Sequence, residues 1–349
     1  MTSVHFLAPG DINRETGGYR YDREVIAGLR RLGYRVAWHA LADSFPRPDP
    51  VALEQAAAVL ARLPAGAAVV IDGLALAPLA DLLPAHPHRL RLIALIHHPL
   101  ADETGLSADQ QRRFFELEQR ALVLADKVIV TSPFTARELE RYGVAAENIA
   151  VVLPGTEPVA DHQVFRTASS IPLLLCVATL IPRKGHRFLI EALGQLRELP
   201  WRLVCIGSLT TAPPTVAEIR ELIAEHGLGE RVELMGELTH DMLAAWYRQA
   251  DLFVLPSQHE GYGMALGEAL AYGLPIVSTK AGAIPDTVPP GAGLLTPPGD
   301  TQALAAALRL LLTDSWRRQQ LAAAARQAGR QLPAWPETAA RFAAALAIP

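Results

Sequence analysis

The sequence has few or none of the features that mark several classes of protein. Among its 349 residues are only two cysteines, and no uncharged apolar run approaches the roughly 20 residues that cross a bilayer. The formal charge is −4, and no block of Lys or Arg forms a basic tail. The N-terminal segment Met1–Gly10 lacks the charged and apolar regions of a signal peptide. We therefore expect a cytoplasmic protein that neither spans a membrane nor binds nucleic acid.

Thiol chemistry and nicotinamide chemistry are also poorly supported. Cys176 and Cys205 each lie in a short apolar run, where a buried structural thiol is more common than a disulfide, a metal ligand or a nucleophile. The loop after the first apolar run reads Ala8-Pro9-Gly10-Asp11 instead of G-x-G-x-x-G, which argues against an NAD-dependent dehydrogenase. No set of ligand-type residues has the spacing of a metal site. We expect no cofactor and no obligatory metal.

What the sequence does contain is a regular alternation of short apolar runs and helical patterns. Half of the residues are apolar, and the length suits two domains of ordinary size. The alternation predicts parallel α/β architecture. The predicted strands are Val4–Leu7, Arg35–Trp38, Val69–Ile71, Leu92–Ile96, Val128–Val130, Ala150–Leu153, Leu173–Val177, Arg202–Ile206, Val232–Met235, Leu252–Leu255 and Ile276–Ser278. The predicted helices include Tyr19–Leu32, Val51–Arg62, Ala108–Ala125, Pro133–Tyr142, Thr301–Leu312 and Trp316–Gln331.

The pattern also predicts where the chain divides. Apolar periodicity is lost from Val159 to Ser170, and this segment is the predicted linker. We expect an N-terminal domain over residues 1–165, a second domain over 166–332, and a final helix over 333–349.

The stretch from Glu260 to Glu268 is the most informative in the chain. It follows a predicted strand and opens a helical pattern, so the expected geometry is strand, turn, helix, with Glu268 about two helical turns inward. Gly261 and Gly263 let backbone N–H groups approach an anion at the helix N-terminus. An ionised carboxylate beside such an anion can accept hydrogen bonds from ribose or sugar hydroxyls. Phosphate, ribose and sugar together indicate a nucleotide-sugar site.

Because paired glutamates eight residues apart arise easily by chance, the flanking sequence carries this prediction. The run Pro256–Asp286 resembles the donor-site signature of family 4 retaining glycosyltransferases, which have the GT-B fold of two Rossmann-like domains with a cleft between them. Val177–Gly185 resembles the phosphate-binding strand and loop of that family, and Thr16–Gly18 resembles its N-terminal glycine loop. The resemblance covers nearly the whole chain, and it implies that the final helix crosses back to the N-terminal domain.

The resemblance implies a donor site in the second domain. Lys184 matches a lysine that stabilises the departing nucleoside diphosphate, whereas Thr179 stands where the family usually has arginine. Arg183 is a candidate replacement. Glu268 is expected to accept the ribose hydroxyls, and Glu260 to contact the transferred sugar or the leaving phosphate. The full set of predicted donor residues is Arg183, Lys184, Met235, Glu260, Gly261, Tyr262, Gly263, Met264 and Glu268.

On the acceptor side, the resemblance places a histidine facing the sugar directly after the strand Leu92–Ile96. That residue is His97, with His98 as the second candidate. A metal site at this pair would need a third ligand at useful spacing, and only Asp102 and Glu103 are close. The other predicted acceptor-side residues are Gly17, Gly18 and Tyr19, with Arg14 and Glu103 as further candidates.

The implied activity is a retaining hexosyltransferase. It would move a sugar from a nucleoside diphosphate to a hydroxyl of a glycan, lipid-linked or small-molecule acceptor. The expected mechanism is metal-independent front-face substitution, with His97, Lys184 and Glu260 as the catalytic group. Two alternatives stay open: a nucleotide-sugar epimerase of GT-B architecture, and a non-catalytic sugar-nucleotide-binding subunit. The arginines of the first predicted helix (Arg20, Arg23, Arg30 and Arg31) would also allow peripheral membrane contact, although a solvated helix face is the better explanation.

Overall fold

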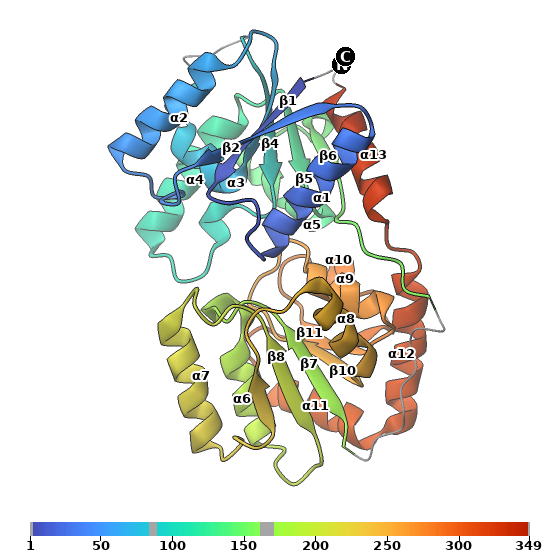
Figure 1. Cartoon of the computed structure of the whole chain (residues 1–349). Helices are drawn as coiled ribbons and strands as arrows, with labels where there is room; N and C mark the ends of the chain where they lie inside the picture. Colours follow the sequence, from blue (N-terminus) through green and yellow to red (C-terminus); the bar gives the residue numbers. More distant parts are fainter. Residues whose placement is uncertain (1–2, 84–88, 161–170, 348–349) are drawn as a thin grey trace. The chain divides into compact units, whose positions relative to one another are not determined.

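The computed structural model describes residues 3–83, 89–160 and 171–347, and the chain divides into two compact units (Figure 1). Unit 1 contains Met1–Gly155 together with Pro333–Pro349, and unit 2 contains Thr156–Leu332. The predicted boundary at residue 165 and most of the predicted linker lie outside the described residues. Among the residues that are described, no helix combines the length and apolarity needed to cross a membrane.

Unit 1 is built on a six-stranded parallel sheet with the strand order β2-β1-β3-β4-β5-β6. The chain runs from β1 outward to β2 and then returns to the other side of β1, so the order reverses between β1 and β3. In open α/β sheets, ligands bind beyond the carboxyl ends of the strands at such a switch point. The strands are β1 (Ser3–Pro9), β2 (Arg35–Leu41), β3 (Ala68–Asp72), β4 (Arg91–Ile96), β5 (Lys127–Val130) and β6 (Ile149–Val151).

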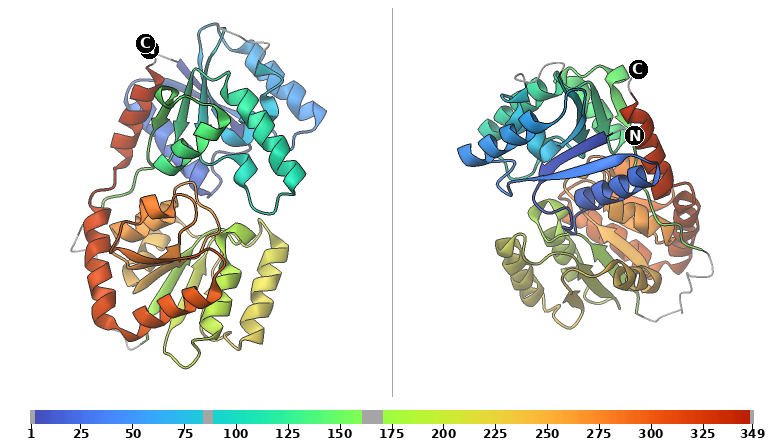
Figure 2. Two further views of the ribbon diagram at one scale, coloured as in Figure 1. Left: turned by 180° about the vertical axis from the view of Figure 1, so that it is seen from behind. Right: turned by 45° about the horizontal axis from the view of Figure 1, so that its top comes forward.

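Helices cover both faces of this sheet (Figures 1 and 2). They are α1 (Gly17–Arg31), α2 (Pro50–Arg62), α3 (Gly73–Leu76), α4 (Ala108–Leu122), α5 (Pro133–Glu138) and α13 (Trp335–Leu346). The last helix, α13, packs against α1 within unit 1, where the Phe6 and Phe342 rings stack at 5.8 Å and Thr338 donates to the Leu153 carbonyl at 2.9 Å. The predicted return of the final helix to the first domain is therefore confirmed.

Unit 2 is also built on a six-stranded, fully parallel sheet, with the strand order β12-β11-β10-β7-β8-β9. Its switch point lies between β7 and β10. The strands are β7 (Leu173–Val177), β8 (Arg202–Ile206), β9 (Val232–Leu234), β10 (Leu252–Leu255), β11 (Ile276–Thr279) and β12 (Gly293–Thr296). The edge strand β12 was not predicted from the sequence.

The helices of unit 2 enclose one continuous apolar core around this sheet. They are α6 (His186–Gly194), α7 (Pro213–Glu225), α8 (His240–Gln249), α9 (Met264–Ala271), α10 (Ile284–Thr287), α11 (Thr301–Thr313) and α12 (Ser315–Gly329). Contacts of α6 with α11 and of α9 with α12 join helices that are far apart in the sequence. Strands β7 and β10, which carry the two loops at the switch point, lie within this core.

Local sequence signals explain several helix ends. Ser132 caps α5 by accepting from the Thr135 N–H at 3.0 Å, and Gly143 adopts φ 78° where the following turn ends. Serine is a common N-cap residue, and glycine is common in the left-handed conformation that ends a helix. The predicted helix Pro133–Tyr142 is α-helical only to Glu138, because its last residues tighten into a 3₁₀ turn.

Candidate functional site

In unit 2, the loops that follow β7 and β10 lie against each other at the switch point. Gly185 has φ 72°, and a Cβ atom there would overlap the carbonyl oxygen of Pro256. The N–H of Gln258 donates to the carbonyl of Arg183 at 2.7 Å. Only glycine combines this left-handed backbone with so close an approach. The sequence Arg183-Lys184-Gly185 thus brings two cationic side chains to the β10 loop.

Lys184 and Glu260 form a buried ion pair at this point. The ammonium Nζ lies 2.7 Å from Oε1 of the carboxylate, and their side chains are only 18% and 6% exposed. The Ser257 hydroxyl donates to the same oxygen at 2.6 Å. Burial by itself raises the pKa of Glu260, but the charges of Lys184 and Arg183 and the hydrogen bonds outweigh burial, and the pKa is lowered overall. The carboxylate is therefore ionised at neutral pH.

Arg183 reaches the same carboxylate from the neighbouring position. Its NH1 donates to the carbonyl of His259 at 2.9 Å and lies 3.9 Å from Oε2 of Glu260. Adjacent side chains in this 3₁₀ turn therefore converge on one carboxylate. Thr179 stands earlier in the same loop, where the Ile181 N–H donates to its carbonyl at 2.9 Å.

The β10 loop is held by hydroxyl groups that the sequence analysis did not single out. Thr279 donates to the Ser257 carbonyl at 2.5 Å, and Thr287 donates to the Tyr262 carbonyl at 2.6 Å. The N–H of Ala283 donates to the Glu260 carbonyl at 2.8 Å. These donors come from elements that follow the loop in sequence, so they tie the backbone around Glu260 to β11 and α10.

Helix α9 begins four residues after Glu260. Gly263, at φ 86°, precedes its first residue, Met264, so Glu268 lies in the second turn and not about two full turns inward as predicted. The prediction placed Glu268 too far along the helix because residues 261–263 belong to the loop, and the sequence pattern does not distinguish them from the start of the helix. The N–H groups of Leu266 and Gly267 donate to the Gly263 carbonyl at 2.8 and 3.3 Å, and a helix N-terminus of this kind is suited to an anion.

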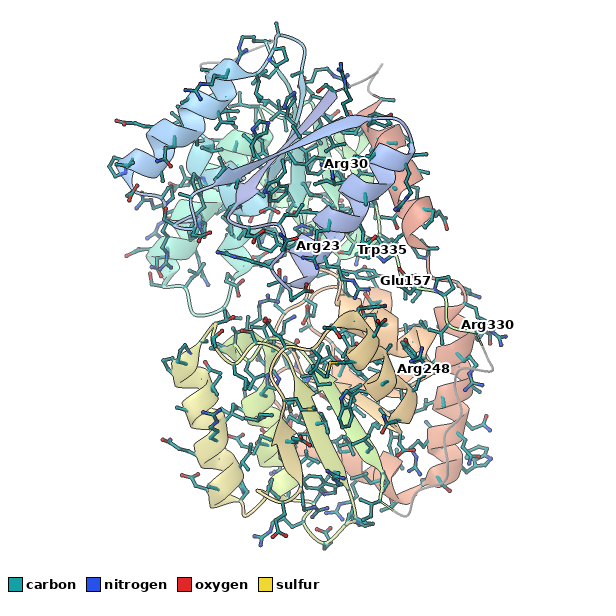
Figure 3. The ribbon with its side chains drawn as sticks, in the orientation of Figure 1. Arg23, Arg30, Glu157, Arg248, Arg330 and Trp335 are labelled. Atoms are coloured by element: carbon teal, nitrogen blue, oxygen red, sulfur yellow. The ribbon has the colours of Figure 1, made fainter. Side chains whose placement is uncertain are left out.

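Glu268 is oriented by an aromatic cluster. The Tyr247 hydroxyl donates to its Oε2 at 2.8 Å, and the Tyr247 ring stacks on Tyr272 with centroids 5.1 Å apart. Arg248, which follows Tyr247 on α8 and is labelled in Figure 3, places its guanidinium 5.7 Å from the Tyr272 ring. Tyr247 was not predicted as a site residue, because an aromatic in a helical pattern is usually core.

Met235, the remaining predicted donor residue, lies one position beyond the end of β9. Its N–H donates to the Cys205 carbonyl at 3.0 Å, and the next carbonyl, of Gly236, accepts from Gly207 at 2.9 Å. The sheet pattern continues here through the backbone, so this N–H group serves the sheet. If Met235 contacts the nucleobase of a donor, it does so through atoms other than this N–H group.

In unit 1, His97 lies at the switch point together with two buried carboxylates. Its Nε2 is 3.6 Å from Oδ1 of Asp22 and 3.5 Å from Oδ2 of Asp72, and its ring is 23% exposed. Burial lowers the pKa of His97, but the adjacent carboxylates of Asp22 and Asp72 outweigh burial and raise it to about 10. Burial raises the pKa of Asp22 to about 6.

Neither Asp22 nor Asp72 was predicted as a site residue, although the sequence carries a signal for each. Asp72 is the last residue of β3, at the strand end where polar site residues belong. Asp22 interrupts the buried face of α1, which otherwise presents Val25, Ile26 and Leu29. A carboxylate on an apolar helix face has to be compensated by a partner.

Gly17 and Gly18 are the first two residues of α1, and a Cβ atom at Gly18 would lie 3.5 Å from the His97 ring. The loop therefore does approach the site closely. Tyr19 is buried, and its hydroxyl donates to the Pro9 carbonyl at 2.5 Å. Desolvation, with the nearby charge of Asp72, raises the pKa of Tyr19 to about 12. Its hydroxyl thus holds the loop after β1.

The two consecutive histidines point to different partners. His98 Nε2 lies 3.2 Å from Oε2 of Glu103, away from the carboxylates that face His97. The segment between His98 and Glu103 is held by the buried Glu118, whose carboxylate accepts a hydrogen bond from the N–H of Leu100 at 2.6 Å. Burial raises the pKa of Glu118 to about 7. His97, and not His98, is therefore the member of the pair that lies among Asp22 and Asp72.

Both cysteines are free and buried, as predicted. They oppose each other on β7 and β8, and His186 Nε2 lies 3.6 Å from Cys176 Sγ. Among the residues described, Cys176, His186 and Cys205 place ligand-type atoms within 4.8 Å of one another, as do Asp22, Asp72 and His97. Spacing alone does not identify an ion, and we assign neither group as a metal site. The absence of an obligatory metal stays a prediction.

Comparison with known proteins gives two family profiles that match consecutive parts of the chain. The profile described as Glycosyl transferases group 1 matches residues 160–328, and the profile described as Glycosyltransferase Family 4 matches residues 46–159. Together they contain most of unit 2 and the latter part of unit 1.

Curated relatives carry related descriptions. A D-inositol 3-phosphate glycosyltransferase of Xylanimonas cellulosilytica is 34% identical over 239 residues, covering 64% of this chain and 57% of the relative. An MMP alpha-(1->4)-mannosyltransferase of Mycolicibacterium hassiacum is 28% identical over 354 residues, covering 96% of this chain and 83% of the relative. The match to the inositol phosphate enzymes thus spans little more than half of their length.

Solved structures show the same fold. A sucrose-phosphate synthase from Thermosynechococcus elongatus superimposes with a TM-score of 0.81 at 23% identity, covering 99% of this chain and 98% of that chain. Anabaena HepE in complex with UDP-glucose gives 0.77 at 21% identity, with 99% of each chain covered. With two parallel six-stranded sheets and two matching profiles that run from residue 46 to residue 328, the chain belongs to the family 4 glycosyltransferases of the GT-B fold.

Proposed function

We propose that the protein is a retaining glycosyltransferase that moves a hexosyl unit from a nucleoside diphosphate sugar to a hydroxyl acceptor. The observation that carries the proposal is the buried Lys184–Glu260 pair beside the N-terminus of α9, at the switch point of the second sheet. A cation, a helix N-terminus and an ionised carboxylate at one point suit a diphosphate attached to a sugar.

In this proposal, Lys184 stabilises the charge that develops on the leaving diphosphate. Its ammonium lies 2.7 Å from Glu260, and it turns from this carboxylate to the diphosphate when the donor binds. Arg183 adds a second positive charge from the same turn. The N–H groups at the start of α9, from Met264 onward, bind phosphate oxygens. Glu260 then accepts a hydroxyl of the transferred sugar while Lys184 turns to the diphosphate.

Glu268 has the separate task of binding the ribose. Tyr247 holds one carboxylate oxygen, so the orientation of the group is set before the donor arrives. Gly261, Tyr262 and Gly263 carry the loop between the two glutamates and bring its backbone near the donor. Tyr262 is buried, and desolvation raises its pKa to about 12, so it stays a neutral phenol.

Transfer itself needs no protein nucleophile in this scheme. The bond between the anomeric carbon and the diphosphate oxygen breaks, the acceptor hydroxyl oxygen bonds to the same face of that carbon, and its proton passes to the leaving phosphate. The protein contributes position and charge stabilisation. The proposal requires no divalent cation, because Lys184, Arg183 and the α9 N-terminus supply the positive charge.

The test begins with donor binding. UDP-, GDP-, ADP- and dTDP-sugars are compared by thermal shift, since a ligand that binds only the folded state raises the apparent melting temperature. HepE was solved with UDP-glucose, so that donor is the first to try. The preferred donor is then incubated with hydroxyl acceptors, and the anomeric configuration of the product is read by NMR.

The outcomes separate the possibilities. Transfer with retention supports the proposal, and an inverted product contradicts it. Turnover of the donor sugar into an isomer without acceptor would indicate an epimerase. Donor binding with no transfer to any acceptor would indicate a binding subunit. Failure of every nucleotide sugar to bind would remove the donor site altogether.

A further inference from the structure

The cluster around His97 has an unbalanced charge. Two carboxylates, from α1 and from the end of β3, approach a single ring nitrogen at 3.6 and 3.5 Å. Both Asp22 and Asp72 are buried. Carboxylate oxygens only accept hydrogen bonds, so a bare lone pair on Nε2 would face two acceptors with no donor between them. Because two acceptor oxygens face this side of the ring, the geometry favours a proton on Nε2.

The second ring nitrogen is in a different environment. Nε2 is buried and makes no hydrogen bond of good geometry, because the two carboxylate oxygens lie 3.6 and 3.5 Å away. Nδ1 makes none with the described residues either, and the ring as a whole is 23% exposed. Nδ1 therefore belongs to the part of the ring that is not buried. A neutral ring protonated on Nε2 would offer an acceptor at Nδ1, and an imidazolium would offer a donor there. Which of these is present decides what His97 can do.

The other groups around the ring do not compensate the two carboxylates. The Tyr21 ring meets the His97 ring edge-on, with centroids 5.4 Å apart, and carries no charge. Tyr19, on the same helix as Tyr21, has a raised pKa and is also a neutral phenol. Arg23 contributes charge to Asp22, but its guanidinium donates to the carbonyls of Ile12 and Arg14 (Figure 3). Thr131, the residue after β5, donates to the backbone carbonyl of His97 at 3.3 Å and not to its ring.

We propose that Asp22 and Asp72 are positioning residues that hold His97 as an imidazolium throughout the neutral pH range, so that Nδ1 is a permanent hydrogen-bond donor. The proposal deepens the glycosyltransferase function and rests on it for its consequence. The charge balance supports it: two buried negative charges are offset better by a ring that carries a full positive charge than by a neutral ring. The raised pKa of His97 agrees with this geometry.

The chemical consequence is that His97 does not act as a general base. An imidazolium has no lone pair to receive the proton of the acceptor hydroxyl. That proton therefore passes to an oxygen of the leaving diphosphate as the acceptor oxygen bonds to the sugar. His97 instead donates from Nδ1 to an oxygen of a substrate bound at the unit 1 switch point, which it orients or polarises.

The protonation state is measured without any substrate. Protein labelled with ¹⁵N-histidine is titrated by NMR in EDTA, and the His97 signals are assigned with the His97→Gln variant. We expect both ring nitrogens of His97 to remain protonated at pH 7.5. Asp22→Asn and Asp72→Asn should each lower the His97 pKa by about 1–3 units, the usual effect of one adjacent opposite charge. Asp109→Asn, at an exposed position on α4, is the matched control and should leave it unchanged.

A His97 signal with one protonated nitrogen at pH 7.5, or a titration near 6.5 in the wild-type protein, would overturn the proposal. The wild-type result stands even if an aspartate variant fails to fold. The activity arm is separate: an imidazolium predicts kcat without an acidic limb near pH 6.5, and a general base predicts such a limb. A protein that keeps the imidazolium but transfers no sugar would contradict the proposed function and leave the protonation state established.

Discussion

The two units place charged groups at the same topological position but balance them differently. In unit 2, Lys184 and Glu260 form a short pair at 2.7 Å, with Ser257 donating to the same carboxylate. In unit 1, His97 faces two carboxylates at 3.5 and 3.6 Å, and neither distance is a good hydrogen bond. The Glu260 carboxylate thus has a cation and a hydroxyl donor at hydrogen-bond distance, whereas the two carboxylates beside His97 share one cationic ring and leave an excess of negative charge.

The difference has opposite consequences for stability. The pKa of Glu260 is lowered in the folded state, so its contribution is present above its ordinary pKa of 4.5 and is lost as the pH falls through the lowered value. The pKa of His97 is raised from 6.5 to about 10, so its contribution is complete below pH 6.5 and is lost as the pH rises toward 10. Acid therefore weakens one cluster and alkali the other.

The largest expected effect is on catalysis in unit 2. Lys184→Ala should lower kcat by about 10²–10³, the usual cost of losing one group that stabilises a developing anion. Lys127→Ala is the matched control, because this half-buried side chain at the start of β5, in unit 1, donates to the Glu147 carbonyl at 2.8 Å. Steady-state kinetics with the preferred donor measures both.

Lys184→Ala also deprives the buried Glu260 of its nearest cation, so folding has to be checked by thermal unfolding. Lys184→Arg keeps the charge and should fold even where the alanine variant is unstable. Near-normal kcat in a folded Lys184→Ala protein would remove Lys184 from the reaction and leave the pair as a structural one.

Substitution of Glu260 and of Glu268 should change different kinetic constants. Glu268 binds the ribose, which does not react, so Glu268→Gln should raise the KM for donor and change kcat little. Glu260→Gln should lower kcat, by roughly ten- to a hundredfold if one hydrogen bond to a charged group, worth about 1.5–3 kcal/mol, is lost in the transition state. Identical kinetic defects, or unchanged donor affinity by calorimetry in Glu268→Gln, would refute this division.

A smaller effect should appear in the pH dependence of stability. The free energy of unfolding of the wild-type protein should fall between pH 6.5 and 10, and the fall should be shallower in His97→Gln. Below pH 4.5, the loss should be shallower in Glu260→Gln than in wild type. Chemical denaturation across this range measures both. Parallel curves for all three proteins would show that neither cluster has the shifted pKa described here.

The smallest expected effect is that of chelation. The initial rate of transfer should be unchanged in excess EDTA, because Lys184, Arg183 and the α9 N-terminus are proposed to supply the charge. Initial rates are the correct measurement, since magnesium can still change product release. Loss of activity in EDTA that manganese or magnesium restores would contradict the metal-free proposal.

Much of unit 2 could be predicted from the sequence because its site residues lie in short contiguous runs. The strands Leu173–Val177 and Leu252–Leu255 were predicted with the boundaries observed, and Lys184 and Glu260 lie in the loops that follow them. Strand β12 was missed because its four residues contain only two leucines and lie between proline- and glycine-rich turns.

The unit 1 cluster was harder to predict because its members come from three separate elements. His97 follows an apolar strand and was singled out for that reason, but Asp22 lies within α1 and Asp72 ends β3. Their convergence depends on the strand order and on the rotation of α1 about its axis. Neither is encoded in any short run of residues.

Helix α13 gives the chain an unusual order of assembly. The α1 face that carries Tyr21 is covered by Trp335 and Phe342, and Ala339 lies so close to Gly28 that a larger residue there would collide with it. Ribosomes synthesise α13 only after every residue of unit 2. Unit 1 is therefore begun before unit 2 and completed after it, and its apolar α1 face stays uncovered until α13 has been synthesised.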